Sequence, residues 1–431
     1  MRIAVIGAYG LIGSYITSRL IQEGHAVLGF GREIAAAQRR FPSVSWATAD
    51  LATSSVDAWA TLLDGADAVV NCAGALQDSP RDDLQAVHVT GVERLAAACL
   101  QAGVGRFVHI SAAGVAAGRE MAFNRTKLAA EAALAATELD WIILRPGLVL
   151  APAAYGGTAL LRGLAGLPYG LPSAFPESAV QLVSVEDVAE AVIRILARPD
   201  LRQVSIDLVH AERHGFEALL TALRQWLGLP PGRILRVPAA LIGVTARMAD
   251  GLAYLGWRSP MRSAALAQLR LGVTGDAEAA RRLLGLELRS LRQILDAWPA
   301  GVQERWFARS YFLKPAMLIG LGLFWLLSGT IGLTVSFAPA VAVLTEVGVA
   351  PALAKAAVIG GGLADILLGS AVAFRRAAPW ALRGMLLVSA AYLMGGTLLR
   401  PDLWLDPLGP FLKVIPGMLL AAAALAILDE R

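Results

Sequence analysis

The first thirteen residues constrain the fold most, because they place three glycines at a fixed spacing directly after an apolar run. Residues 2–6 form that run, and an amphipathic segment over residues 11–21 follows it. This order predicts a buried strand, a tight turn and a helix that begins at the last glycine. Such a turn lets the backbone approach a pyrophosphate and directs free helix N–H groups at it. The residues predicted to bind the cofactor here are Gly7, Tyr9, Gly10, Leu11, Ile12 and Gly13.

The composition indicates that this nucleotide-binding domain is only part of the chain. Its 431 residues are too many for one ordinary domain. Hydrophobic residues make up 56% and charged residues 17%, with a mean hydropathy of +0.58. Charge gathers in the first 310 residues, whereas apolar runs dominate residues 315–428. We therefore expect a nucleotide-binding domain at 1–300, with a substrate or lid part at about 151–300, a linker at 301–314 and a membrane domain at 315–431.

Charge, cysteines and histidines exclude several classes of partner. The net charge is only +4, and no basic block is interleaved with aromatic residues, so no nucleic acid is expected. Cys72 and Cys99 fit reduced, buried thiols better than a disulfide framework. His210 and His214 are four residues apart but have no evident third ligand, so no metal is expected. No signal peptide precedes the first strand, which predicts a cytosolic N-terminal part.

Strands and helices alternate along the first two hundred residues. Further strands are expected at 26–30, 44–48, 68–71, 106–110 and 204–208, and helices at 84–102, 185–196 and 283–298. This alternation predicts an α/β fold with a Rossmann-type, doubly wound parallel sheet. Ligands bind such sheets at the carboxyl ends of the strands, so the residues that follow each strand are the candidates for a site.

The residue after the second strand bears on the choice of cofactor. NAD-binding folds usually carry a carboxylate there, whereas Arg32 suits a 2′-phosphate. The sequence therefore favours NADP. NAD remains an alternative, because Glu33 follows directly and Arg32 could simply begin a solvated helix.

Several motifs then resemble the short-chain dehydrogenase/reductase superfamily, in its extended or atypical branch. They follow the glycine turn in the family's order: Asp50-Leu51, Asn71-Cys72-Ala73-Gly74, Arg106-Phe107-Val108-His109-Ile110-Ser111, Phe123-x-x-x-Lys127, Leu144-Arg145-Pro146-Gly147 and Val185-Glu186-Asp187-Val188-Ala189. The resemblance covers about residues 1–300. Within the superfamily, the chain is most similar to the NAD(P)-binding accessory subunit of respiratory complex I and its bacterial relatives.

The resemblance implies roles for individual residues. Asp50 and Leu51 would border the adenine, and Ala73 and Gly74 would line the cofactor groove. Ser111 would face the substrate carbonyl, Lys127 would hold the nicotinamide ribose, and Pro146 would flank the nicotinamide.

One departure from the family's pattern affects catalysis. Phe123 stands where the family has a catalytic tyrosine, four residues before Lys127. A phenol whose pKa is lowered by a nearby lysine exchanges a proton with the substrate as hydride moves, and phenylalanine has no such proton. Tyr9, Tyr155 and His109 are weaker substitutes, since Tyr9 is expected near the phosphates and His109 inside a strand. Cofactor binding is therefore expected, but the ordinary carbonyl–alcohol chemistry is not.

Residues 155–176 are the expected lid or pocket wall. Their apolar side chains would either face an apolar substrate or pack in the core: Leu160, Leu161, Leu164, Leu167, Leu171 and Phe175. Residues 238–257 are apolar but are interrupted by Arg247 and Asp250. We expect an amphipathic helix there, lying on the domain or on the membrane surface rather than spanning it.

The last 115 or so residues predict a membrane domain. Four apolar segments are each long enough to cross a bilayer, at 316–337, 352–374, 380–399 and 411–428. Arginines and lysines cluster before the first segment and between the second and third, which predicts that these ends are cytoplasmic. The chain is thus expected in the inner membrane, with four spans, both termini in the cytoplasm and the lipid bilayer as a partner.

The membrane half resembles the DoxX-like family, on residues 324–329 and, more specifically, 403–413. Glycines would let its helices approach closely, at 320, 322, 329, 332, 360–362, 369, 395 and 396. Asp365 lies within a predicted span, where an ionisable group is costly. It is a candidate proton or quinone-headgroup site, or a partner in an interhelical hydrogen bond.

Two classes of function are compatible with these features. The first is an oxidoreductase that passes hydride from NADPH to a hydrophobic membrane acceptor such as a quinone or isoprenoid. The second is a catalytically silent module that senses NADPH or stabilises a membrane protein complex, and Phe123 favours it. A nucleotide-sugar epimerase is a weaker alternative, because the missing tyrosine counts against it.

Overall fold

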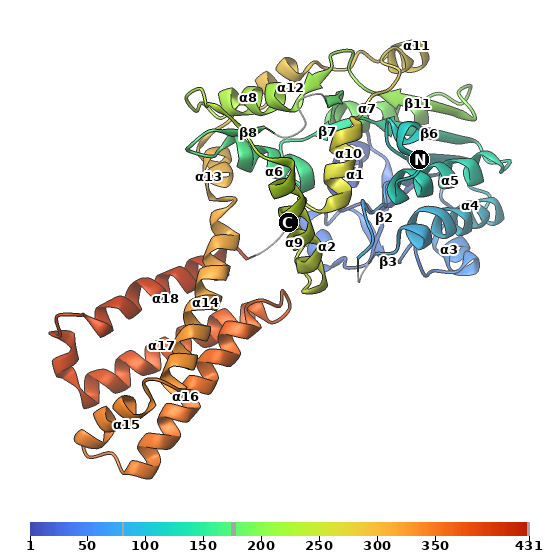
Figure 1. Ribbon diagram of the computed structural model, residues 1–431. Coiled ribbons are helices and arrows are strands. Elements are labelled where there is room, and N and C mark those ends of the chain that lie inside the picture. The colour runs from blue at the N-terminus through green and yellow to red at the C-terminus, as the bar shows by residue number, and fades with distance from the viewer. Residues whose placement is uncertain (80–81, 174–177, 429–431) are drawn as a thin grey trace. The chain divides into compact units, whose positions relative to one another are not determined.

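The computed structural model describes residues 1–79, 82–173 and 178–428 and divides into two compact units (Figure 1). The first unit comprises Met1–Asp250 and Ser259–Ala308, and the second comprises Gly251–Arg258 and Arg309–Arg431. The stretch expected to be a linker, residues 301–314, contains helix α13 (Val302–Ser310) and the beginning of α14 (Leu313–Leu333).

The first unit is built on a seven-stranded sheet, in which all paired strands are parallel. Its order, β11-β6-β5-β4-β1-β2-β3, places β1 in the interior and reverses direction there, as in a doubly wound fold. The fold class predicted from the sequence is therefore confirmed. The strands are β1 (Arg2–Ile6), β2 (Ala26–Gly31), β3 (Ser45–Thr48), β4 (Ala68–Asn71), β5 (Arg106–Ile110), β6 (Trp141–Pro146) and β11 (Val204–Leu208).

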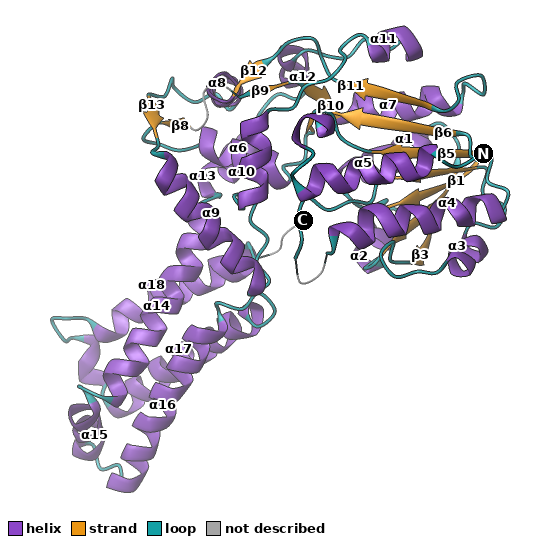
Figure 2. Cartoon of the chain, turned by 45° about the vertical axis from the view of Figure 1, so that its right-hand side comes forward, coloured by secondary structure: helices purple, strands orange, loops and turns teal. Residues whose placement is uncertain are grey.

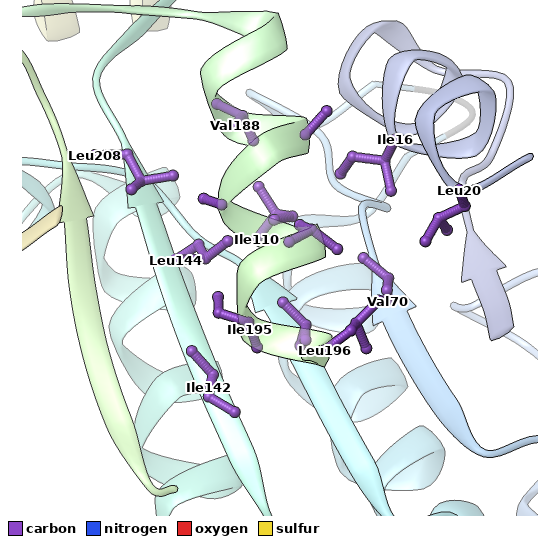
Figure 3. Close-up of a cluster of buried hydrophobic side chains, with 14 of the residues drawn as sticks. Ile16, Leu20, Val70, Ile110, Ile142, Leu144, Val188, Ile195, Leu196 and Leu208 are labelled. Atoms are coloured by element: carbon purple, nitrogen blue, oxygen red, sulfur yellow. The ribbon is translucent and has the colours of Figure 1, made fainter. Parts of the chain in front are cut away.

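Helices cover both faces of this sheet, which is why β1 is apolar at successive positions. Ile3 and Val5 of β1 belong to the core beneath α1 (Leu11–Gln22) and α7 (Val185–Leu196). Figure 3 shows this core, where side chains of α1 and α7 meet those of β4, β5, β6 and β11. Ala4 and Ile6 point the other way, into a second core under α3 (Val56–Leu62), α4 (Gly91–Gln101) and α5 (Ala122–Ala135).

The remaining elements of the first unit are short or lie around the sheet (Figure 2). The helices predicted at 84–102 and 185–196 are present, although the first begins with a π-helical stretch, Gln85–Thr90. The other elements are α2 (Ala35–Arg40), a 3₁₀ turn (Val115–Gly118), β7 (Leu148–Leu150), α6 (Gly156–Ala165), β8 (Leu171–Ser173), β9 (Ala179–Val180), β10 (Leu182–Ser184), β12 (His214–Gly215), α8 (Phe216–Trp226), β13 (Ile234–Arg236), α9 (Ala239–Tyr254), α10 (Ser263–Leu271), α11 (Ala279–Leu284) and α12 (Leu291–Ala297).

The prediction of one helix over 283–298 is wrong, because α11 ends at Leu284 and α12 begins only at Leu291. Gly285 ends α11 in the left-handed region, with a φ of 60°. Ser290 then begins α12 with a capping box, in which its hydroxyl accepts from the Gln293 N–H and the Gln293 side chain accepts from the Ser290 N–H.

Three of the six apolar side chains named in the expected lid pack in the core. Leu161 of α6 and Leu171 of β8 are buried in a third cluster with α8, and Leu164 packs against it. Arg162 of α6 donates to the carbonyls of Ala151 and Pro152, which fixes this helix to the chain after β7. Phe175 and Pro176, which the sequence analysis placed in the same lid, lie outside the described residues.

The second unit is helical and contains three helices that are long and apolar enough to cross a membrane. They are α14, α16 (Pro351–Ala371) and α17 (Ala378–Leu399). The expected fourth span corresponds to α18 (Pro410–Ala426), which has 17 residues, and a shorter apolar helix, α15 (Phe337–Glu346), lies between α14 and α16. A 3₁₀ turn (Pro401–Trp404) precedes α18. The chain is therefore a membrane protein, while a count of four spans and the cytoplasmic position of both termini remain predictions.

Glycines allow α14 and α16 to pack at close range, as expected for membrane helices. A Cβ on Gly329 would lie 2.5 Å from the Gly362 carbonyl oxygen, and one on Gly369 would lie 2.7 Å from the Leu326 nitrogen. Gly322 and Gly362 are similarly confined, and Gly396 faces the ring of Phe411. Among the other predicted glycines, 320, 332, 360, 361 and 395 have nothing within 4 Å of such a Cβ.

Candidate functional site

The glycine turn forms one end of the candidate site, which we call the phosphate end: Gly7, Gly10, Gly13 and the start of α1. Gly7 has a φ of 74°, a conformation that favours glycine. A Cβ on Gly13 would overlap the Gly7 carbonyl oxygen, so the helix can approach the strand only with glycine there. Helix α1 begins at Leu11, and its N-cap residue, Gly10, has no side chain that could accept a hydrogen bond from the first turn. Its first N–H groups therefore lack intrahelical partners and suit a pyrophosphate.

Tyr9 and Arg32 lie at the neighbouring end of β2. The Tyr9 hydroxyl accepts from the backbone N–H groups of Arg32 (3.2 Å) and Glu33 (3.4 Å). Its ring crosses Gly31, where a Cβ would overlap it, so glycine is required at that position. The Arg32 guanidinium pairs with Asp82 at 2.9 Å. Burial lowers the pKa of Arg32, but the charges of Asp82 and Asp50 raise it overall.

The other predicted cofactor residues lie after the adjacent strands. Asp50 follows β3, and its Oδ1 accepts from the Ala52 N–H at 3.0 Å. Leu51 is buried beside Gly91. Ala73 donates its N–H to the Asn71 Oδ1 at 3.1 Å, just beyond β4. The structure thus places these residues along the carboxyl edge of the sheet, where the sequence analysis expected them.

The opposite end of the site, which we call the reaction end, consists of Ser111, Phe123, Lys127 and Glu131. Phe123, Lys127 and Glu131 recur every four residues on α5 and therefore share one face of that helix. The Lys127 Nζ is buried and donates to the Ile110 carbonyl at 3.0 Å. A Cβ on Gly74 would lie 3.4 Å from this nitrogen, so the structure brings Lys127 to the predicted cofactor groove.

Ser111 is bound to a carboxylate that the sequence analysis did not identify. Its hydroxyl donates to the Glu131 Oε1 at 2.5 Å. Arg145 in turn pairs with the Glu131 Oε2 at 2.5 Å and approaches Asp207 at 3.8 Å. The proton of Ser111 is therefore directed at Glu131. Pro146, the next residue of β6, accepts from the Ala113 N–H at 2.9 Å and so fixes the loop after Ser111.

Two histidines lie near Lys127, and both are held neutral. His88 Nε2 accepts from the Ala75 N–H, so its Nδ1 carries the hydrogen and donates to the Thr126 Oγ1 at 2.8 Å. Burial, and then the charge of Lys127, lower the pKa of His88 to about 3. The same causes put the pKa of His109 well below its ordinary value. Neither ring therefore replaces the missing tyrosine as an acid at neutral pH.

The two tyrosines that could replace the missing one lie on other elements than Lys127. Tyr9 follows β1, its ring lies over Gly31 at the end of β2, and its hydroxyl accepts from backbone N–H groups there. Tyr155 precedes α6 as its N-cap residue. The ring of Phe123 faces the edge of His88, with centroids 5.7 Å apart.

Lys127 is the remaining candidate acid of the reaction end. Burial lowers its pKa from 10.5 to about 8, although the charge of Glu131 opposes this shift. Burial also raises the pKa of Cys72 to about 12, which keeps this thiol protonated. At neutral pH Lys127 is therefore a buried ammonium group that gives up its proton more readily than an ordinary lysine.

Asp365 is the polar residue of the membrane unit that the sequence analysis singled out. Its Oδ2 accepts from the Ser328 hydroxyl at 3.2 Å, which joins α16 to α14. This contact matches the structural alternative, an interhelical hydrogen bond. His210 and His214 flank Glu212, and among the described residues no group of three or more potential ligands could hold a metal ion.

Comparison with known families agrees with this division of the chain. Residues 7–199 match the model of the NAD(P)H-binding family, and residues 322–422 match that of the DoxX-like family. The chain therefore joins a region similar to the NAD(P)H-binding family to a region similar to the DoxX-like family.

Curated relatives match a little more than half of the chain. Uncharacterized proteins of Mycobacterium tuberculosis and Mycobacterium bovis are 27% identical over 229 residues, which are 52% of this chain and 23% of theirs. The chain thus matches less than a quarter of the length of these relatives. The ceramide reductase of Caulobacter vibrioides is 24% identical over 262 residues, which are 59% of this chain and 78% of that protein.

Solved structures share the fold of the first unit. MoeE5 in complex with UDP-glucose and NAD has a TM-score of 0.53 at 21% identity, and the match covers 72% of this chain and all of that one (100%). A UDP-glucose 4-epimerase from Stenotrophomonas maltophila with bound NAD has a TM-score of 0.54 at 20% identity, covering 73% and 99%.

Proposed function

We propose that the protein is a membrane-tethered, NADPH-dependent reductase that passes hydride to a hydrophobic acceptor from the bilayer, such as a quinone or a lipid carbonyl. The observation that carries the proposal is the buried ammonium of Lys127, held beside Gly74 on the helix face that carries Phe123. Burial makes this ammonium group a better proton donor than an ordinary lysine, which is the property that a reductase without the tyrosine needs.

In this proposal, the phosphate end of the site binds the nucleotide and the reaction end supplies the proton. The glycine turn and the start of α1 would hold the pyrophosphate, and Ala73 and Gly74 would line the groove. NADPH, when bound, supplies the hydride. The acceptor oxygen then needs a proton, which Lys127 donates because Phe123 has none and Ser111 is bound to Glu131. Lys127 regains its proton from solvent.

Two further observations support the choice of acceptor and cofactor. One relative with 78% of its length aligned is named a ceramide reductase, and a reductase for a lipid needs access to a membrane. Arg32, directly after β2, favours the 2′-phosphate of NADP. Its guanidinium now pairs with Asp82 and would pair with the phosphate when NADPH binds.

The second candidate is a catalytically silent module that binds NADPH as a sensor or as a stabilising part of a membrane complex. The observation that favours it is the pairing of Ser111 with Glu131, which leaves that hydroxyl without a proton for a substrate carbonyl. The epimerase alternative rests on the shared fold and lacks the catalytic tyrosine.

Turnover separates these candidates. The full chain in lipid nanodiscs is given NADPH and either a short-chain quinone or a lipid carbonyl, and NADPH oxidation is followed by absorbance. We expect steady turnover, reduced about 100-fold or more in Lys127→Met because general-acid catalysis is lost. Calorimetric titration with NADPH, done on both proteins, separates a loss of chemistry from a loss of binding. Tight binding without turnover on any acceptor would support the silent module.

A further inference from the structure

Helix α9 carries two different apolar stripes, and only one of them is buried. Ile242, Ala246, Ala249 and Ala253 recur at helical spacing and are each at most 9% exposed. A second stripe consists of Leu241, Val244, Met248 and Leu252, which are between 42% and 64% exposed. The larger side chains are therefore the outer ones, which is the reverse of an ordinary surface helix.

The polar residues of α9 do not cover this second stripe. Arg247 lies about 100° around the helix from Met248. Asp250 pairs with Arg262 at 3.1 Å, which directs its carboxylate to the loop before α10. A continuous apolar strip of this kind on a surface helix marks a site of contact with a protein or a membrane.

The end of the same helix shows which of these partners the stripe meets. Leu255 accepts from the Arg375 N–H at 2.9 Å, and the Trp257 indole donates to the Ala373 carbonyl at 2.6 Å. Ala373 and Arg375 lie between α16 and α17, two helices of membrane-spanning length, and thus at the end of the spans. Met248 is seven residues before Leu255, or about 10 Å along the helix.

The residues at this end of the spans are those that anchor proteins at a membrane surface. The Arg375 guanidinium lies over the ring of Trp257, 5.6 Å from its centroid, and Arg383 lies over Trp380 at 5.0 Å. Tryptophan and arginine favour the headgroup region, and basic residues favour its cytoplasmic side. A helix that emerges here with an exposed apolar stripe has the composition of an interfacial helix.

We propose that the outer stripe of α9 inserts into the cytoplasmic leaflet of the bilayer. The occupant of this surface is lipid, because the helix continues directly into a segment held at the end of the spans.

The connection from α9 to α10 gives this surface a role in the proposed reaction. Arg262, between the two helices, donates to the Asp78 carbonyl at 3.0 Å in the loop after β4. At the end of α10, the side chain of Leu271 fills the space beside Gly118, in the loop after Ser111. Both loops border the reaction end. If the proposed function holds, a lipid acceptor reaches the reaction end along α9 and α10.

Depth-sensitive fluorescence tests the insertion without relying on catalysis. Single cysteines are placed at Val244 or Met248 in a background with Cys72→Ser and Cys99→Ala, labelled with NBD and reconstituted as the full chain in liposomes. Lipids that carry doxyl groups on their acyl chains should quench both labels, by several fold more than a label at the matched control, Arg247. Equal quenching at 247 and 248 would overturn the proposal. So would a signal at 248 that depends on protein concentration but not on doxyl lipid, which would indicate a second copy of the chain.

A functional arm separates this proposal from the proposed activity. The double variant Val244→Glu/Met248→Glu should lower turnover of a long-chain membrane acceptor about tenfold. Its two carboxylates make insertion of the stripe into the bilayer unfavourable. Turnover of a water-soluble short-chain acceptor and NADPH binding should not change. Unchanged turnover of the long-chain acceptor would contradict the role in substrate access, whereas absence of all turnover would contradict the proposed function and leave the quenching result valid.

Discussion

The phosphate end and the reaction end of the candidate site differ in how far they keep the family's pattern. At the phosphate end, Gly7, Gly10 and Gly13 are all present, and the structure leaves no room for a side chain on Gly13. At the reaction end, Phe123 replaces the tyrosine, and Ser111 donates to Glu131 instead of facing an open space. In the proposed function, cofactor binding and proton transfer fall to separate groups of residues, and only the second group departs from the family's pattern.

The largest effect should come from the phosphate end. In Gly13→Ala the new Cβ would overlap the Gly7 carbonyl, and α1 would have to move away from the pyrophosphate. Loss of two charge-assisted hydrogen bonds, each worth about 1.5 kcal/mol or more, should weaken NADPH binding about 100-fold. Calorimetry measures this, and Gly157→Ala is the control because a Cβ there meets nothing within 4 Å. Normal affinity in Gly13→Ala would remove the glycine turn from the site.

The reaction end should respond in the opposite direction. Phe123→Tyr restores a phenol one helical turn before Lys127, and the lysine charge should lower the pKa of that phenol. We expect turnover of a carbonyl acceptor to rise at least about tenfold, since a positioned general acid contributes that much or more. Phe123→Leu, which removes the ring without adding a hydroxyl, should give no gain. A tyrosine variant no faster than the natural protein would show that protonation does not limit the reaction.

The smallest effect concerns the choice between the two nucleotides. Arg32→Asp should weaken NADPH binding about tenfold more than NADH binding, because only NADPH offers a phosphate to the guanidinium. The matched control is Arg39→Asp, an exposed charge on the neighbouring helix α2. Titration of each variant with both nucleotides gives the comparison. Equal losses for NADPH and NADH would exclude Arg32 as the 2′-phosphate contact.

The sequence predicted those parts of the molecule that depend on local pattern. The strand–turn–helix at the N-terminus, the parallel sheet and the apolar helices after residue 313 follow from spacing and periodicity. The prediction of one helix over 283–298 failed because it ignored two local signals. The left-handed Gly285 ends α11, and the capping box at Ser290 begins α12. The apolar residues of α6 were ambiguous, since core packing and a pocket wall have the same composition.

The site residues that the sequence analysis missed all act through contacts between distant segments. Glu131 follows Lys127 by four residues, a spacing that puts it on the same helix face and was available as a signal. Its partner Arg145 comes from β6, and the pairing of Asp82 with Arg32 joins the loop after β4 to the end of β2. Such pairs depend on strand order, which the sequence does not state.

The pH dependence of turnover tests the central claim most directly. The full chain in nanodiscs would oxidise NADPH with a membrane-borne carbonyl acceptor between about pH 6 and pH 10. Because the donor is the ammonium form of Lys127, whose pKa is about 8, activity should be level below that pH and should fall about tenfold per unit above it. Activity that stays level through pH 10, or NADPH binding with no turnover, would contradict the account.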